Sequence, residues 1–431
     1  MSTTLAPQAA PWFYRILLTL VVPFALLRLW WRGRKQPGYR QHIGERFGFI
    51  RVPQGQPVIW LHAVSVGETR AAEPLVHALL KQYPQHRLLL THMTPTGRET
   101  STSLYQDPRI LIAYLPYDLT GAVDRFLQRV RPSFGLLMET EIWPNLILRC
   151  RRHGVPVMLI NARLSERSAR RYTRFATHIR PVLTALSATG AQTRDDAERL
   201  AALGANPISI TGNLKFDVRI NPMQQEQGRD WRTSLTAKRP VWLAASTREG
   251  EEAIILAAHR ALCARLSAQH PLLVLVPRHP QRFNDIAVQI QREGFALQRR
   301  SIGLPDDTTD VWLGDSMGEM VAYYSMADLA VIGGSLLPFG GQNLIEAAAC
   351  GCPLIIGPHT YNFLDAAALA ESTGAALRIQ EVDAERLAAA VEWLLTDTGH
   401  REQHCRATTH FVRSATGATE KTMALIANAL N

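Results

Sequence analysis

Acidic residues that directly follow apolar runs offer the clearest chemistry in the sequence. Glu68 stands in the stretch HAVSVGETRAAEPLV, after the apolar run 58–61 and a turn of small residues. The run predicts a buried strand, and helical spacing begins near Thr69. Ligands of open α/β sheets bind at the carboxyl ends of parallel strands, which would place Glu68 at such a site. The alternative is an ordinary first-turn acid that the helix dipole stabilises.

A second acidic pair, Glu139 and Glu141, follows the apolar run 134–138 in the stretch METEIWPN. Pro144 is well suited to the first turn of a following helix. We expect only one of these two acids to face the site. For either acid taken singly, helix capping is an equally good explanation.

Basic and glycine-rich stretches follow later apolar runs. In VPRHPQRF, the planar guanidinium of Arg278 would suit a phosphate or carboxylate, whereas a role for His279 is left open. In LGDSMGEM, Gly314 and Gly318 would let the backbone approach a ligand closely. Asp315 would then accept hydrogen bonds from a sugar or base, although a plain turn with a helix cap explains it equally well.

The stretch IGGSLLPFGGQNLIEAAACGCPLIIGP is the most informative of these. A strand would end in Gly333-Gly334, and Gly340-Gly341 would open a helix at about 342–349. A helix N-terminus after a glycine-rich loop favours a phosphate, and Glu346 could take ribose hydroxyls. The chain has no GxxxxGK[ST] and no early GxGxxG, which argues against a nucleoside triphosphatase and a standard dehydrogenase.

The elements that must position these residues follow a strand–helix alternation that runs from Pro57 to about Asn213 and restarts after Lys238. The polar segment Asn221–Lys238 between them is interpreted as an interdomain connection. The predicted strands are 58–62, 87–91, 110–115, 134–138, 155–160, 187–192 and 209–211, then 241–245, 272–276, 311–313, 329–332 and 354–356. This pattern predicts two Rossmann-like α/β domains facing a cleft.

Composition limits the possible partners and the compartment. The 431 residues are 46% hydrophobic and 19% charged, with a net charge of +10 that favours nucleic acid, anionic lipid or a phosphorylated substrate. The five cysteines contain no CxxC pair, so we expect reduced thiols in the cytosol and neither a zinc site nor disulfides.

The N-terminal segment from Trp12 to Trp31 has the character of a membrane helix. Its apolar centre, 16–27, is short for a bilayer span, and aromatic residues occur at both ends. The basic residues that mark the cytoplasmic side are Arg28, Arg32, Arg34, Lys35 and Arg40. No signal-peptidase site follows the apolar centre. We therefore predict an N-terminal membrane anchor or an interfacial helix with the body in the cytoplasm.

A row of arginines at three- and four-residue spacing is the last feature of interest. Arg163, Arg167, Arg170 and Arg174 would share one face of a helix. Such a row is usually a solvated face, and in a membrane-anchored protein it could contact lipid phosphates.

Several motifs in the same order resemble a known family over nearly the whole chain. HAVSVGE, ETEIWPN, GNLKFD, ASTREGEE, PRHPQRF and GGSLLPFGGQNLIEAAACGCPLIIGP resemble the 3-deoxy-D-manno-octulosonic acid (Kdo) transferases of lipopolysaccharide synthesis. The resemblance implies a GT-B glycosyltransferase with no catalytic metal and no cofactor. It implies CMP-Kdo as donor and the lipid A precursor (lipid IVA) as acceptor, at the cytoplasmic face of the inner membrane, with an anionic lipid surface as a further partner.

The resemblance also implies residue roles. Glu68 matches the general base, which would deprotonate the acceptor hydroxyl as it attacks the anomeric carbon with inversion. The positions that match the CMP-binding residues are Pro277, Arg278, Met317, Gly318, Glu319, Asn343, Leu344, Ile345 and Glu346. Supporting candidates are Glu139, Glu141, Lys215, Ser246 and His279.

The predicted domains are 1–36 for the anchor, 37–222 for the acceptor domain and 223–431 for the donor domain, with packing of the last helix on the acceptor domain left open. A nucleotide-sugar epimerase of the same fold and a membrane-tethered module that binds nucleic acid are the alternatives. The absence of a recognised nucleic-acid motif argues against the second. The number of Kdo residues added, the oligomeric state and the choice between a spanning and an interfacial anchor are not predicted.

Overall fold

The computed structural model describes residues 10–34, 36–236 and 239–431. Residues 1–9 and Lys35 of the predicted anchor region lie outside the described residues, as does Lys238 at the end of the predicted connection. The chain forms two compact units. Unit 1 comprises residues 1–217 and 415–431, and unit 2 comprises residues 218–414. The chain therefore enters unit 2 once and returns to unit 1 for its last helix, and each unit is described by itself.

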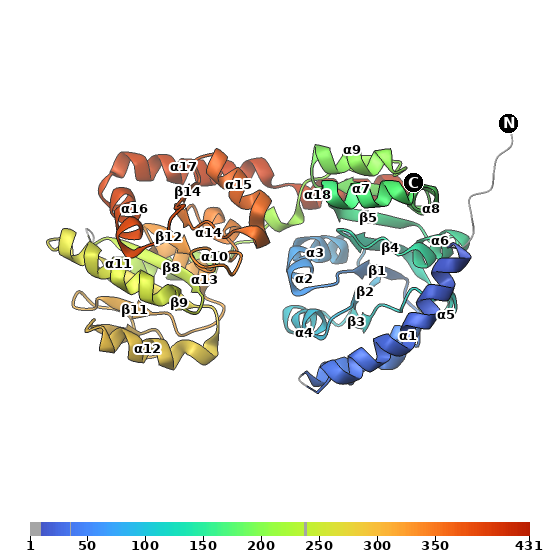
Figure 1. The fold of residues 1–431 in the computed structure, drawn as a ribbon, viewed down its shortest axis with the longest axis horizontal. Helices are drawn as coiled ribbons and strands as arrows, with labels where there is room; N and C mark the ends of the chain where they lie inside the picture. The colour runs from blue at the N-terminus through green and yellow to red at the C-terminus, as the bar shows by residue number, and fades with distance from the viewer. Residues whose placement is uncertain (1–9, 35, 237–238) are drawn as a thin grey trace. The chain divides into compact units, whose positions relative to one another are not determined.

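Unit 1 is built on a seven-stranded parallel sheet (Figure 1). Its strands are β1 (Val58–His62), β2 (Arg87–His92), β3 (Ile110–Tyr114), β4 (Pro132–Met138), β5 (Val157–Ala162), β6 (Ala188–Ala191) and β7 (Ile208–Ile210). They lie in the order β3-β2-β1-β4-β5-β6-β7, with β1 paired to both β2 and β4. The order therefore changes direction between β1 and β4.

Both faces of this sheet are covered by helices. The helices of unit 1 are α1 (Trp12–Arg32), α2 (Val66–Ala71), α3 (Glu73–Gln82), α4 (Pro95–Leu104), α5 (Thr120–Val130), α6 (Pro144–Arg152), α7 (Glu166–Arg174), α8 (Ala176–Thr184), α9 (Arg194–Ala202) and α18 (Ala418–Leu430). Short 3₁₀ turns are η1 (Pro37–Arg40), η2 (Ile43–Phe47) and η3 (Leu214–Phe216). Successive residues of a strand point to opposite faces of the sheet and therefore belong to two separate cores. Trp60 packs with α5, α6, α8 and α9 in one core, and Leu61 packs with α3 and α18 in the other.

The last helix belongs to unit 1 because it completes one of these cores. Leu425 and Ile426 of α18 are buried with residues of α3 and β6. The Asp217 carboxylate accepts the Gly417 N–H at 2.7 Å, just before α18 begins. This acceptor satisfies a backbone donor where the chain returns from unit 2.

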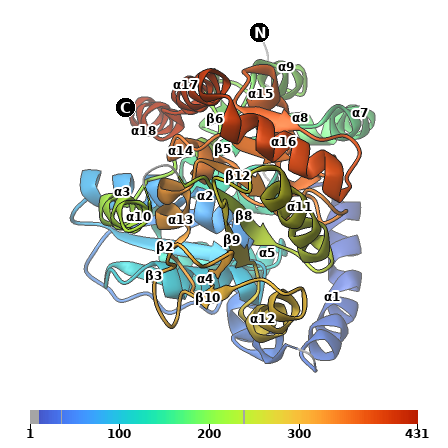
Figure 2. The ribbon, with the colours of Figure 1, turned by 90° about the vertical axis from the view of Figure 1, so that its left-hand side faces the viewer.

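Unit 2 has a second seven-stranded parallel sheet in the order β10-β11-β9-β8-β12-β13-β14. The strands are β8 (Val241–Thr247), β9 (Leu272–Pro277), β10 (Leu297–Arg299), β11 (Val311–Leu313), β12 (Leu329–Ile332), β13 (Leu354–Ile356) and β14 (Ala376–Arg378). The helices are α10 (Pro222–Thr233), α11 (Glu251–Arg265), α12 (Phe283–Arg292), α13 (Met320–Met326), α14 (Ile345–Ala349), α15 (Leu364–Ser372), α16 (Ala384–Thr396) and α17 (Thr398–Ala415), with 3₁₀ turns η4 (Pro280–Arg282) and η5 (Tyr361–Phe363). Figure 2 shows α11 and α16 on one side of this sheet and α10 and α13 on the other.

Every predicted strand overlaps an observed one, so the predicted alternation is confirmed. The prediction missed β10 and β14, which are three-residue strands at the two edges of the second sheet. All five cysteines are free thiols in the structure.

The interpretation of Asn221–Lys238 as a connection is wrong over most of its length. This segment forms α10, which packs on α13. Trp231 is buried against Trp312 and Tyr323, with ring centroids 5.1 and 5.3 Å away, and a Cβ at Gly228 would lie 2.2 Å from the Ala322 carbonyl oxygen. A single tryptophan and a close glycine contact give this polar sequence a packed face, which a count of apolar residues does not reveal.

Candidate active site

The candidate site in unit 1 lies where the strand order reverses. Glu68 follows β1, and Glu139 follows β4, the neighbouring strand on the other side of the reversal. Lys215 follows β7 in η3. Carboxyl ends of parallel strands share one edge of the sheet, and the reversal point is the usual ligand crevice of such sheets.

The local sequence fixes Glu68 through the start of α2. Ser65 is the N-cap, and its Oγ accepts the Glu68 N–H at 3.4 Å and donates to Glu68 Oε1 at 3.0 Å. Glu68 Oε2 accepts the Val64 N–H at 2.8 Å. This arrangement is a variant of a capping box in which Glu68 accepts the N–H of Val64, the residue before the N-cap, instead of that of Ser65. The helix begins at Val66, three residues before the predicted start near Thr69.

The protonation equilibrium of Glu68 is shifted toward the acid. Burial raises the pKa of Glu68, and the negative charges of Glu139 and Glu141 raise it further. The hydrogen bonds from Val64 and Ser65 act in the opposite direction by stabilising the carboxylate. A carboxylate with a raised pKa is a stronger base than an exposed one.

Glu139 and Glu141 are two positions apart, a spacing that places side chains on the same side of an extended chain, so it gives no reason for only one of them to face the site. The chain is also not extended here. Glu139 has a left-handed backbone with φ of +55°, which turns the chain between the two acids. Both carboxylates lie close enough to Glu68 to raise its pKa.

The partners of the two acids differ. Glu139 Oε1 lies 3.4 Å from Lys215 Nζ, the ammonium of the GNLKFD stretch. Glu141 Oε2 accepts the Trp143 indole N–H at 2.8 Å and lies 3.5 Å from Nε2 of the buried His62. The structure thus brings together three carboxylates and one lysine at the end of the first sheet.

In unit 2, the glycine loop after β12 is held by a buried carboxylate that the sequence analysis did not single out. Glu251 is fully buried, and its Oε2 accepts the N–H groups of Arg248 at 2.8 Å and Gly334 at 2.7 Å. Its Oε1 accepts the N–H of Leu336 at 3.0 Å and that of Leu337 at 3.3 Å. One side chain therefore ties the end of β8 to the loop after β12.

Ser246 lies at the same junction, with a left-handed backbone of φ +58°. A Cβ at Gly333 would lie 2.4 Å from the Ser246 carbonyl oxygen, so only glycine fits there. This close approach crosses from β8 to β12, the reversal point of the second sheet.

The predicted residues after β9 divide into buried and exposed ones. Pro277 is buried at the end of the strand, whereas Arg278 and His279 are exposed. Partial burial and the positive charges of Arg248, Arg278 and Arg282 lower the pKa of His279. Arg282 is paired with the buried Glu252 at 2.8 Å. The loop thus carries a local excess of positive charge that suits an anion.

The remaining predicted donor residues lie after β11 and β12. Met317 is exposed, Gly318 has φ of +82°, and Glu319 accepts hydrogen bonds from Arg300 Nη2 at 2.8 Å and from Gln227 of α10 at 3.4 Å. The Asp315 carboxylate accepts hydrogen bonds from Arg299 Nε at 2.7 Å and from the Ser301 N–H at 2.8 Å. These bonds favour the interpretation of Asp315 as a structural residue over a role in ligand binding.

The helix after Gly340-Gly341 begins later than predicted. α14 starts at Ile345 instead of about residue 342, because Asn343 turns back to accept the Ile345 N–H at 3.0 Å. Leu344 and Ile345 are buried, and Glu346 is the second residue of the helix rather than one turn in. The predicted phosphate site therefore consists of a longer loop followed by a short helix.

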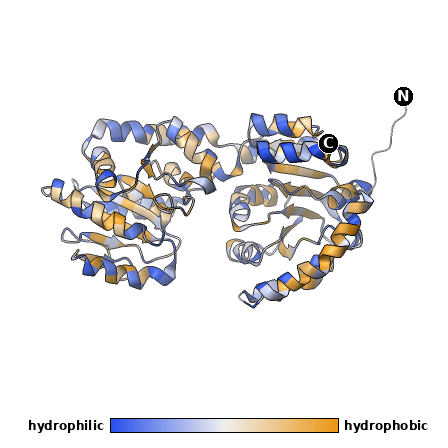
Figure 3. Ribbon diagram, viewed as in Figure 1, coloured by the Kyte–Doolittle hydropathy of each residue, from blue (hydrophilic) through white to orange (hydrophobic). Residues whose placement is uncertain are grey.

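The arginine row is only partly on one helix. Arg167, Arg170 and Arg174 lie on α7, an exposed and hydrophilic helix (Figure 3), whereas Arg163 precedes its Ser165 N-cap. The three arginines of α7 and its Arg171 line a shallow cavity of about 330 Å³. Arg170 is also paired with Glu166 at 2.5 Å.

Two further residues of the candidate site escaped the sequence analysis. Glu251 belongs to the quoted ASTREGEE stretch; it is buried like Glu252, but it alone accepts backbone N–H groups of the loop after β12. Asn161, at the end of β5, has φ of +50°, and its Oδ1 accepts the Leu214 N–H at 3.0 Å beside Lys215. Within the part of the chain that the structure describes, no group of three His, Cys, Asp or Glu side chains has a metal-binding arrangement.

Comparisons with known proteins agree on one family. Residues 41–218 match the family described as 3-deoxy-D-manno-octulosonic-acid transferase (kdotransferase), and residues 293–410 match glycosyl transferases group 1. The 3-deoxy-D-manno-octulosonic acid transferase of Bordetella pertussis is 43% identical, over 95% of this chain and 97% of that protein. The protein of the same name from Haemophilus influenzae is 39% identical, over 96% and 97%. A glycosyltransferase from Rickettsia africae shares the fold, with a TM-score of 0.56 at 12% identity over 88% of this chain and all of that one.

Proposed function

Because the chain belongs to the 3-deoxy-D-manno-octulosonic acid (Kdo) transferase family, a group of glycosyltransferases of lipopolysaccharide synthesis, we propose that it transfers Kdo from CMP-Kdo to the lipid A precursor with Glu68 as general base. The predicted fold class is confirmed: two Rossmann-like domains of the GT-B type and an N-terminal apolar helix. The arrangement of Glu68 at the β1/β4 reversal is the observation that carries the proposed mechanism.

The proposed step uses the raised basicity of Glu68. The acceptor hydroxyl oxygen attacks the anomeric carbon of Kdo while its proton passes to Glu68, and the bond to the CMP phosphate breaks with inversion. Glu139 and Glu141 strengthen the base by raising its pKa. Lys215 offsets part of this negative charge through its 3.4 Å contact with Glu139. A positioned base of this kind contributes about 10² to 10⁴ in rate.

Donor binding is proposed for unit 2. The CMP phosphate would be held beside Arg278, near the charges of Arg248 and Arg282 that already lower the pKa of His279. The loop held by Glu251 would present backbone N–H groups to the donor. Metal independence stays a proposal: these cations would stabilise the leaving phosphate in place of a metal ion.

Membrane association is proposed to occur through α1 lying in the plane of the bilayer. α1 has the length and apolar composition of a membrane span, and this alone is weak support. Figure 3 shows α1 as hydrophobic over much of its length. The exposed apolar residues on one side of it are Phe13, Leu17, Leu20, Phe24, Leu27 and Trp31.

The other side of α1 contacts the polar body of unit 1 at both ends. Near the N-terminal end, the Tyr14 hydroxyl donates to the buried Asp118 at 2.9 Å. Near the C-terminal end, Leu29 is buried, and Arg40 of η1 donates to the Trp30 carbonyl oxygen at 2.9 Å. A helix attached at both ends of its roughly 30 Å length is better suited to lie on a membrane than to cross it. The inner membrane and its cytoplasmic side follow from the proposed substrates.

The test is mass spectrometry of lipid A precursor after incubation with CMP-Kdo and the detergent-solubilised protein. A mass increment of one or more Kdo residues is expected, and its size gives the number of sugars added. Glu68→Gln should bind CMP as the unchanged protein does and lose about 10² to 10⁴ in transfer rate. Glu73→Gln, which changes a partly exposed acid in the first turn of α3, is the matched control. Retention of most activity by Glu68→Gln would exclude Glu68 as the base.

An epimerase of the same fold is the second candidate from the sequence. It requires neither a lipid acceptor nor the exposed apolar side of α1. Conversion of a free nucleotide sugar without any lipid product would favour it over transfer.

A further inference from the structure

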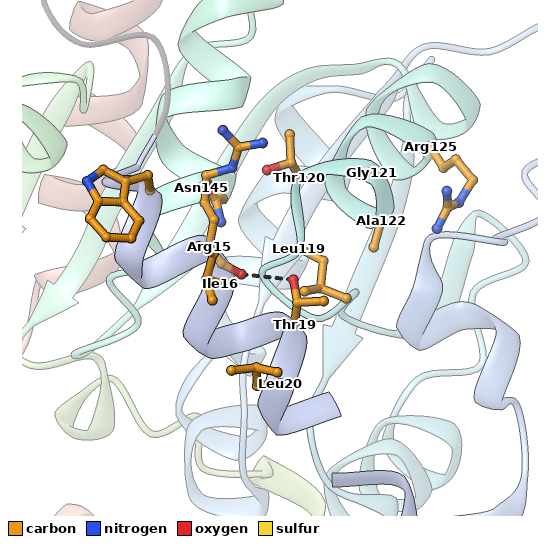
Figure 4. Close-up of a pocket in the computed structure, with 11 residues that line it drawn as sticks. Arg15, Ile16, Thr19, Leu20, Leu119, Thr120, Gly121, Ala122, Arg125 and Asn145 are labelled. Atoms are coloured by element: carbon orange, nitrogen blue, oxygen red, sulfur yellow. Dashed lines mark hydrogen bonds between the residues drawn. The ribbon is translucent and has the colours of Figure 1, made fainter. Parts of the chain in front are cut away.

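A cavity of about 620 Å³ lies between α1 and the beginning of α5 in unit 1 (Figure 4). Its volume falls within the roughly 300–1,000 Å³ of small-ligand sites. Neither the proposed base nor any proposed donor residue lines it. A role in the transfer chemistry therefore does not explain this cavity.

One part of the cavity is apolar and continues onto the exposed side of α1. Ile16 and Leu20 line the cavity and are nevertheless 52% and 64% exposed, and Leu119 closes it from the loop before α5. Exposed apolar side chains at the mouth of a cavity are poorly suited to a small polar ligand in water. A hydrocarbon chain that enters from the membrane would cover them.

The other part of the cavity is cationic. Figure 4 shows the Arg15 side chain reaching from α1 toward Thr120 at the start of α5, with Arg125 further along that helix. Arg125 Nε donates to the Phe47 carbonyl at 2.9 Å, which fixes the guanidinium and leaves its other N–H groups for a ligand. No acidic side chain is among the described residues that line the cavity.

The backbone adds to this positive potential. The first turn of α5, at Thr120, Gly121 and Ala122, forms part of the wall. Its N-cap is Leu119, whose side chain offers no acceptor to the N–H groups of that turn. Two guanidinium groups and the N-terminus of an eleven-residue helix together match one phosphate group.

We propose that this cavity binds one anionic glycerophospholipid of the surrounding membrane. The lipid phosphate lies between Arg15 and Arg125 at the start of α5, and an acyl chain follows Ile16 and Leu20 along α1. A soluble phosphate would use only the cationic part, and an uncharged lipid only the apolar part. The bound lipid fills the space between α1 and the body of unit 1, and it joins the helix to an anionic bilayer.

The experiment uses the full-length protein in a nonionic detergent and a short-chain probe, dioctanoyl phosphatidylglycerol, with native mass spectrometry as the readout. The unchanged protein should retain one probe molecule. Arg15→Gln should weaken retention by about fivefold, the effect of one arginine near an anionic lipid. Thr19→Trp should abolish retention because the indole fills the cavity from α1 without removing a charge.

The controls distinguish a specific lipid-binding site from a general electrostatic attraction between a basic protein and an anionic lipid. Arg28→Gln removes a charge from the same helix outside this cavity and should leave retention unchanged. Dioctanoyl phosphatidylcholine and inorganic phosphate should each fail to displace the probe at equal concentration. Equal binding of phosphatidylcholine would overturn the proposal, as would displacement by phosphate alone. It is equally overturned if Arg28→Gln weakens retention as much as Arg15→Gln, or if a folded Thr19→Trp protein keeps the lipid.

Discussion

The buried carboxylate of Glu251 offers the sharpest test of how unit 2 is held together. It accepts four backbone N–H groups, two on each oxygen, from the end of β8 and from the loop after β12. Glu251→Gln keeps the shape of the side chain and replaces one oxygen by an amide. That amide would face two N–H groups that are themselves donors, so two hydrogen bonds are lost whichever way the amide is turned.

The expected cost follows from this count. A hydrogen bond to a charged group contributes about 1.5–3 kcal/mol, so the loss of two lowers the free energy of unfolding by about 3 kcal/mol or more. Glu249→Gln is the matched control, because Glu249 precedes Glu251 by two residues and is exposed. Its effect should stay within about 0.5 kcal/mol.

Urea unfolding of the purified full-length protein measures both variants. The Glu251→Gln protein should unfold at a clearly lower urea concentration than the control. Because the loop after β12 carries proposed contacts to the donor, the KM of the Glu251→Gln protein for CMP-Kdo should rise by a larger factor than its kcat falls. If Glu251→Gln were as stable as Glu249→Gln, the carboxylate would not hold the loop and the reasoning would be refuted.

Three further perturbations follow from the structure. The rate of transfer should fall as the pH drops through the raised pKa of Glu68. Glu141→Gln removes a charge that raises this pKa and should move the acid limb of a pH–rate profile to lower pH. Burial raises the pKa of Asp118 to about 6 from 3.8, so the native state binds the proton more tightly and loses stability as pH rises between about 4 and 6. Tyr14→Phe removes a hydrogen bond that lowers this pKa, so the loss should extend to higher pH and become larger, as denaturant titrations at several pH values would show. Gly333→Ala places a Cβ 2.4 Å from the Ser246 carbonyl oxygen and should lower the midpoint of thermal unfolding by several degrees. In the control Gly67→Ala the new Cβ meets nothing closer than 3.9 Å, so the midpoint should be unchanged or higher.

Much of the fold could be predicted because the buried parallel strands are continuous apolar runs. Val58–His62 and Leu272–Pro277 are entirely buried, and such runs are conspicuous in any hydropathy pattern. The edge strands β10 and β14 escaped prediction because they are short and only partly buried. α10 escaped because one buried tryptophan and one close glycine contact hold it, and neither produces a periodic pattern.

The candidate site was harder to predict than the sheets that carry it. That Glu68 lies at the end of β1 follows from the hydropathy pattern, but its neighbours come from strands far along the chain. The left-handed turn at Glu139, which brings both acids near Glu68, has no signal in its sequence, since glutamate seldom adopts that conformation. Glu251 was overlooked because it stands among other acids of the same stretch, and only the packed structure shows which of the two buried ones holds the loop after β12.

The return of the chain to unit 1 has a consequence for how the protein is made. Unit 2 is, in effect, an insertion between residue 217 and residue 415, and α18 completes a core that begins with β1. During synthesis, all of unit 2 emerges from the ribosome before the hydrophobic surface of α3 and β6 can be covered by α18. The unit that is started first is therefore finished last. A nascent chain that stops before Ala418 would expose Leu75 and Leu79 to chaperones and proteases, even with unit 2 intact.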